Sequence, residues 1–95
     1  MEFNWTNPPF NLDPAVTLPA IEESIEDPFA VRLLPDSPRF SVQARFFNLG
    51  LDGSGEGIIS VYKTNGKQLR VIFARRFEPE EKLFYQRKMN LTLAL

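Results

Sequence analysis

Two adjacent arginines, Arg75 and Arg76, are the residues in this chain whose type and position most directly suggest chemistry. They close a strand-like segment and stand just before a helix-like segment that carries Lys82 and Tyr85. The planar guanidinium forms paired hydrogen bonds with phosphate oxygens and stays charged at any relevant pH. Cations gathered at the end of one strand therefore predict a surface that holds a polyanion.

Two further arginines, Arg45 and Arg70, belong to the same predicted sheet. Alternation along residues 68–75 gives Arg75 the parity of the core face and places Arg70 on the other face. We expect Arg45, two strands away, to approach the same rim as Arg75, with Tyr85 as a stacking or proton-donating group. For each cation taken alone, the alternative is a solvated charge or an ordinary surface ion pair.

The composition excludes several kinds of catalytic site. The chain has no histidine and no cysteine, which excludes Ser-His-Asp and Cys-His catalysis and His-ligated zinc. It also lacks an EF-hand pattern and a phosphate-binding glycine loop, so the sequence predicts neither a metal nor a cofactor. Glu78, Glu80 and Glu81 resemble paired carboxylates, but their position favours a helix start, where acids complement the helix dipole.

Charge is divided unevenly along the chain. Residues 1–38 hold one cation and seven acids, whereas residues 39–95 hold ten cations and five acids, so the two parts carry net charges of −6 and +5. Such a division indicates an anionic partner for the basic part. The alternative is that the two parts pair with each other in the fold, and the sequence leaves this open.

The hydrophobic pattern predicts the elements that must position these residues. Strands are expected at residues 2–5, 29–34, 40–49, 57–63 and 68–75, and helices at residues 18–26 and 78–89. Thr17 is the expected N-cap of the first helix, and Pro79 fits the first turn of the second. Asn65-Gly66 predicts a type I′ hairpin turn. The order predicts an α+β fold, an antiparallel meander packed with a short N-terminal helix and a C-terminal helix.

Length and hydropathy indicate one small domain over residues 1–95. A chain of 95 residues with 43% hydrophobic residues can build a single core, and residues 91–95 form an apolar tail. No apolar run approaches the ~18 residues that a membrane span needs, and the N-terminus does not resemble a secretion signal. The absence of cysteine suits a reducing compartment. We therefore expect a cytoplasmic protein without a membrane partner.

Several short motifs resemble the BrnT toxin family, and they lie along nearly the whole chain. Phe3-Asn4-Trp5 is similar to the family's opening Phe-x-Trp. Ala15-Val16-Thr17-Leu18, followed by Asp27-Pro28, matches the register of its Gly-Val-Ser-Phe and later Asp-Pro. Arg45-Phe46, with Gly50, resembles its Glu-Arg-Phe strand and the glycine after it.

The C-terminal half continues the resemblance. The segment from Arg70 to Arg76 is similar to the family's Ile-Arg-Ile-Ile-Ser-Ala-Arg-Lys. Glu81-Lys82, with Tyr85 after it, resembles its Glu-Arg-x-x-Tyr. The order and spacing of these pieces together make the resemblance fairly specific.

The resemblance implies a RelE-like fold and a bacterial toxin of a type II toxin–antitoxin system, an RNA endonuclease that inhibits translation without a metal. By motif, Arg45 and Arg75 would be catalytic, and the RNA-binding residues would be Arg70, Arg76, Lys82 and Tyr85. The implied partners are an RNA substrate and a ribbon-helix-helix antitoxin of BrnA type, through which operator DNA is bound. A second copy of the chain is a further candidate partner.

Departures from the family pattern support a second hypothesis. Asp13-Pro14-Ala15 stands where the family has Lys-His-Gly, and Phe73 replaces its serine. Phe77-Glu78-Pro79-Glu80 replaces a basic Ala-Thr-Arg-Arg run and exchanges two cations for acids and a proline. The alternative is a catalytically degenerate module with the same fold that only binds a partner protein.

Overall fold

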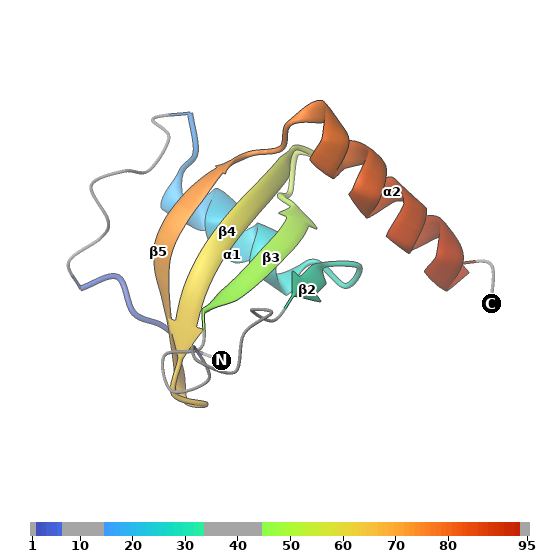
Figure 1. The fold of residues 1–95 in the computed structure, drawn as a ribbon. Coiled ribbons are helices and arrows are strands. Elements are labelled where there is room, and N and C mark those ends of the chain that lie inside the picture. The colour runs from blue at the N-terminus through green and yellow to red at the C-terminus, as the bar shows by residue number, and fades with distance from the viewer. Residues whose placement is uncertain (1, 7–14, 34–44, 94–95) are drawn as a thin grey trace.

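Over its described residues, the protein is an α+β fold with one five-stranded mixed sheet and two helices (Figure 1). The computed structural model describes residues 2–6, 15–33 and 45–93. In chain order the elements are β1 (Glu2–Phe3), α1 (Leu18–Glu26), β2 (Val31–Leu33), β3 (Phe46–Leu51), β4 (Gly57–Thr64), β5 (Gln68–Arg76) and α2 (Pro79–Leu93). This confirms the predicted class and the predicted order of elements.

The element boundaries differ from the prediction most at β3 and α2. The strand expected at residues 40–49 is β3, which runs to Leu51, while residues 40–44 of the expected strand lie outside the described residues. α2 extends to Leu93, beyond the expected end at Met89. Leu91 to Leu93, the first part of the predicted tail, are therefore helical, and residues 94–95 lie outside the described residues.

The strands lie in the order β1-β5-β4-β3-β2. β2, β3, β4 and β5 pair antiparallel to one another in turn, as the meander requires. β1 pairs parallel to β5, with Phe3 opposite Leu69, so the sheet is mixed. The short β1 thereby joins the N-terminal end of the chain to the strand that carries the two arginines.

α1 covers one face of the sheet and builds the core there, behind the sheet in the view of Figure 1. Ile21 and Ile25 of α1 pack with Ile58 and Tyr62 of β4 and with Val71 of β5. The sequence forms the helix at this place because Ile21 and Ile25 are one turn apart on one face. The predicted N-cap is confirmed: the Thr17 hydroxyl oxygen accepts the N–H of Ala20 at 3.3 Å.

A β-bulge in β5 reverses the predicted orientation of Arg75. The register shifts between β4 and β5, so that Ile72 has no partner across the pair. Val71 and Ala74 are consequently both buried under α1, while Phe73 and Arg75 point to the opposite face. The prediction that Arg75 shares the core face of Val71 is wrong, because strict alternation does not account for the extra residue.

The hairpin between β4 and β5 is present, but its connection is longer than the predicted two-residue turn at Asn65-Gly66. Residues 65–67 connect the strands, and the Asn65 side-chain oxygen accepts the N–H groups of Lys67 and Gln68 at 2.9 and 2.8 Å. Gly66 has a φ of 90°, which a residue with a side chain rarely adopts. The asparagine side chain thus replaces one backbone acceptor of the expected turn.

The face of the sheet opposite α1, here called the open face, is crossed by no helix in Figure 1. Alternation and pairing place Phe47, Val61 and Phe73 on it, in one row across β3, β4 and β5. α2 begins at the end of this face and approaches the sheet mainly at β3. Most of the open face therefore lies beside α2 and not beneath it.

α1 lies so close to β3 that a glycine is required at position 50. A Cβ atom there would lie 1.9 Å from the backbone oxygen of Ser24, far inside van der Waals contact. The same oxygen accepts a hydrogen bond from the Asn48 side chain at 3.1 Å. The helix is thus seated on the strand by a backbone contact that a methyl group would force apart.

We therefore expect Gly50→Ala to lower the free energy of unfolding by about 2–4 kcal/mol, since the added atom displaces α1 from the core. Chemical denaturation followed by circular dichroism measures this. Gly55→Ala is the control, because Gly55 has open space around it and should cost only about 1 kcal/mol, from its φ of 87°. Equal losses in the two variants would contradict the close approach of α1.

Candidate functional site

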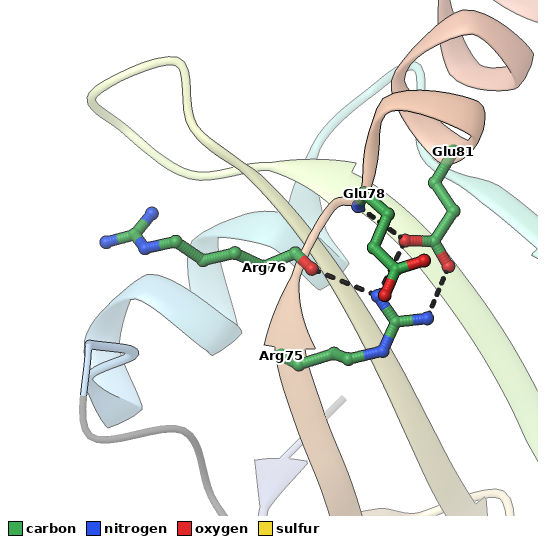
Figure 2. Close-up of polar contacts among 4 residues, drawn as sticks. All are labelled: Arg75, Arg76, Glu78 and Glu81. Carbon is green, nitrogen blue, oxygen red and sulfur yellow. Dashed lines mark hydrogen bonds and ion pairs between the residues drawn. The ribbon is translucent and has the colours of Figure 1, made fainter.

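Arg75 forms an ion pair with Glu81 at the junction of β5 and α2 (Figure 2). Its Nη1 and Nη2 donate to Oε1 and Oε2 of Glu81, each at 2.7 Å. Nη1 also donates to the backbone oxygen of Arg76 at 3.1 Å. This paired geometry is the one that a phosphate would use, so a carboxylate of the protein already takes the place of an anionic ligand.

Glu81 also caps α2, which explains why an acid stands at this position. Its Oε1 accepts the N–H of Glu78 at 2.8 Å, three residues earlier, as in a capping box. Burial opposes ionisation of Glu81, but the hydrogen bonds from Arg75 and from the Glu78 N–H hold its pKa below the ordinary value. The prediction that these acids serve the helix start is confirmed for Glu81.

Arg76 points to the opposite side of the strand from Arg75 (Figure 2). Its Nη2 donates to the backbone oxygen of Ala15 at 2.9 Å, and its Nη1 lies 3.7 Å from Oε2 of Glu56. Successive residues on a strand face opposite sides, so the two adjacent arginines do not converge. Arg76 instead lines a groove that Lys82 also lines, together with Glu56 and Glu78.

Arg45 lies at the other end of the sheet from Arg75. Leu49, Ile59 and Arg75 form one row across β3, β4 and β5, and Arg45 stands four residues before Leu49. That is about 13 Å along the strand and about 10 Å across two strands. The expectation that Arg45 and Arg75 share a rim is wrong, because antiparallel register places the start of β3 beside the start of β5.

Tyr85 is held inside the fold and not at a surface. Its side chain is 2% exposed, and its hydroxyl donates to Oδ2 of Asp27 at 2.6 Å. The same oxygen accepts the N–H of Leu51 at 2.8 Å. Burial, and then the hydrogen bond and charge of Asp27, raise the pKa of Tyr85 far above its usual range. The proposed stacking or proton-donating role has no access to a ligand here.

A different set of cations comes together on the open face. Arg45 directly precedes Phe46, the partner of Tyr62, and so lies level with Lys63, while Lys63 pairs directly with Arg70. All three side chains are exposed. This cationic row, Arg45, Lys63 and Arg70, unites one predicted catalytic residue with one predicted RNA-binding residue. Lys63 was missed, although its position before the hairpin and that of Arg70 after it are a signal in the sequence.

In the part of the chain that the structure describes, the two differently charged parts form no ion pair with each other. Within residues 2–6, 15–33 and 45–93 there are two ion pairs, Arg75–Glu81 and Arg76–Glu56. Both lie within the basic part, residues 39–95. For the described residues this favours the hypothesis of an anionic partner over internal pairing of the two parts.

The described part of the chain contains no cluster of three or more acidic side chains placed to hold a metal ion. In that same part, no helix combines the length and the apolar character needed to cross a bilayer.

Glu81→Gln should lower the free energy of unfolding at pH 7 by about 1–2 kcal/mol, since the charge-assisted bonds to Arg75 and the cap are weakened. Because the folded pKa of Glu81 is lowered, its contribution is present above the unfolded value near 4.5 and is lost as the pH falls through the folded value. The difference in the free energy of unfolding between the natural chain and the variant should therefore disappear in acid. Denaturant titrations at several pH values measure it.

The control for this experiment is Glu80→Gln, which removes an exposed acid from the same helical turn. It should change stability much less at every pH. If the stability difference between Glu81→Gln and the natural chain persisted undiminished in strong acid, the ion pair would not be the cause of that difference.

Tyr85→Phe should lower the free energy of unfolding by about 1–2 kcal/mol, because Asp27 loses a buried donor while the ring stays in place. Tyr62→Phe is the matched control, since Tyr62 is also buried and its hydroxyl has no hydrogen bond to another described residue. Thermal and chemical unfolding of both variants measure the difference. A smaller loss for Tyr85→Phe than for Tyr62→Phe would contradict the structural role of the hydroxyl.

Comparisons of the chain with protein-family models, with curated proteins and with solved structures find no match. The resemblance to the BrnT family thus stays a prediction that rests on the motifs described above.

Proposed function

We propose that this protein is a non-enzymatic module that binds a partner protein. The observation that carries the proposal is the closed Arg75–Glu81 pair, whose bidentate geometry occupies the guanidinium that would have contacted a phosphate. A neutralised arginine adds little stabilisation to the charge that develops on a phosphate in the transition state. Arg75, the residue whose type best suits catalysis, therefore stabilises the junction of β5 and α2.

The other groups near this junction are also unsuited to proton transfer. A general acid or base works best with a pKa near the working pH. The lowered pKa of Glu81 makes it a weak base, and the raised pKa of Tyr85 makes it a weak acid. Arg45 is too far away to complete a site with Arg75. These arrangements support the degenerate alternative, in which a RelE-like arrangement is retained for binding.

A second candidate function is the ribonuclease toxin that the motifs suggest. The observation that favours it is the cationic row, because Arg45 and Arg70 are exposed and adjacent to Lys63. Phosphate contacts supply most of the affinity for nucleic acid. Under this hypothesis the partner would be the ribbon-helix-helix antitoxin, with operator DNA bound through it.

Induced expression in bacteria, together with incubation of the purified protein with RNA, separates the two functions. The partner-binding proposal expects no growth arrest and no cleavage by the natural chain, with no change in Arg45→Ala or Arg75→Ala, because these arginines do not form a joint site. Colony counts and RNA gels give the readout, and Lys67→Ala is the control for removal of an exposed cation.

Growth arrest that is lost in both Arg45→Ala and Arg75→Ala, but kept in Lys67→Ala, would overturn the proposal and establish the toxin. A known ribonuclease added to the same RNA shows that the substrate is cleavable. Circular dichroism of each variant shows that loss of activity is not loss of fold.

A further inference from the structure

We infer that the open face is a docking surface for an amphipathic segment of another protein that carries acidic residues around apolar ones. This inference rests on the proposed partner-binding function and names the surface and the chemistry of the partner. Three features of the molecule support it: the apolar centre of the face, the cations at its ends and the acidic charge of α1 on the other side.

The centre of the open face is an apolar strip that consists of Val31, Leu33, Phe47, Val61 and Phe73, of which Leu33 and Phe47 are exposed and the other three are half-buried. Val31 and Leu33 belong to it because they pair with Leu49 and Phe47 of β3. Leu33 is 41% exposed and Phe47 is 38% exposed. In Figure 1 no helix lies across this part of the sheet. Contiguous apolar surface of this kind marks an interaction site more often than scattered apolar residues do.

The apolar strip continues into a groove beside α2. The groove is lined by Phe29 and Val31 on one side and by Lys88 and Leu91 of α2 on the other. Val31 belongs to both the strip and the groove, so the two surfaces are continuous. Leu91 is 65% exposed, although it stands on a helix whose other end is fixed by Glu81 and Tyr85. A partner that lies along the strip would reach this leucine.

Cations flank the apolar surface at both ends. The cationic row lies at one end, and Lys88 lies in the groove at the other. Lys63 and Arg70 stand directly opposite each other, which is unfavourable for like charges across a strand pair. Among the described residues neither has an opposite charge in an ion pair. Carboxylates of a partner would relieve this repulsion.

The helix on the other side of the sheet carries charge of the opposite sign. α1 covers the other face of the sheet, and it carries the exposed acids Glu23 and Glu26. A molecule with separated charges orients an approaching charged partner before contact. An acidic partner is thus attracted to the open face and repelled by α1.

The chemistry of the strip favours a protein segment over RNA. Bases bind to single-stranded RNA platforms by stacking on exposed aromatic rings. Here Phe47 is the most exposed ring on the strip, Phe73 is half-buried, and the other members are valine and leucine. Aliphatic side chains bury well against the apolar side of an amphipathic helix or strand.

The test is selection from a displayed library of random peptides of about 16 residues, which span about 24 Å as a helix. The bait is the full chain. We expect enriched peptides to combine carboxylates with leucine, isoleucine or aromatic residues, and to bind more weakly as salt is raised. Selected peptides are then synthesised, and their affinities for the natural chain and its variants are measured by fluorescence anisotropy.

Lys63→Glu is the diagnostic variant, because it reverses a charge in the cationic row and gives Arg70 an opposite-charge neighbour without loss of packing. It should weaken the selected peptides about tenfold. Phe47→Ser should weaken them by a similar factor through loss of apolar contact. Lys82→Glu is the matched control, the same exchange at an exposed lysine outside the open face, and should change affinity less than about twofold.

Four results would overturn the inference: no enrichment, enrichment of peptides without acids, equal binding by Lys63→Glu, or a Lys63-dependent complex of another kind. The last includes binding of a single-stranded RNA oligonucleotide and dimerisation seen by light scattering. Peptides that bind but ignore Lys63→Glu would leave the partner-binding function standing and remove only this surface. RNA cleavage in the growth and RNA assay would contradict the proposed partner-binding function itself, regardless of whether peptides bind.

Discussion

The carboxylate of Asp27 is the point on which the arrangement of the two helices depends. It stands at the C-terminal end of α1 and accepts hydrogen bonds from the hydroxyl of Tyr85 on α2 and from the N–H of Leu51 at the end of β3. A third bond, from the N–H of Phe29, turns the chain toward β2. One side chain thus joins both helices, β3 and the turn that leads to β2, and its bonds are satisfied from within the fold.

This network explains why the C-terminal helix begins at the end of the open face and does not lie across it. Tyr85 fixes α2 near the end of β3, and the Arg75–Glu81 pair fixes its first turn to β5. A helix held in its first half extends its second half beyond the sheet, as Figure 1 shows. The exposed leucines of α2 and the apolar strip that neither helix covers are two consequences of the same anchoring.

Charge placement follows from the same architecture. α1 carries Glu22, Glu23 and Glu26 of the N-terminal part on one side of the sheet, while the open face receives Lys63 from β4, Arg70 from β5 and Arg45 from the residue before β3. Because the described ion pairs join residues within the basic part, α1 and the open face keep charges of opposite sign. Uncompensated charge of one sign on an apolar face is a local conflict, and such conflicts are expected where a protein binds.

The sequence by itself determined the elements, because their signals are local. Thr17 and the spacing of Ile21 and Ile25 specify α1, the hydrophobic runs specify the strands, and Asn65-Gly66 specifies a hairpin. The role of Glu81 at the start of α2 is likewise readable from a few neighbouring positions.

Only the tertiary structure decided which candidate residues meet. The bulge at Ile72 places Arg75 on the face opposite to the predicted one. The antiparallel register places Arg45 at the other end of the sheet from Arg75. The hydrogen bond to Asp27 holds Tyr85 in the interior. Each of these depends on a contact between segments distant in sequence, for which residue type and spacing give no signal. A one-residue shift of register moves a side chain to the other face, so a site on a sheet is fixed only when the pairing is fixed.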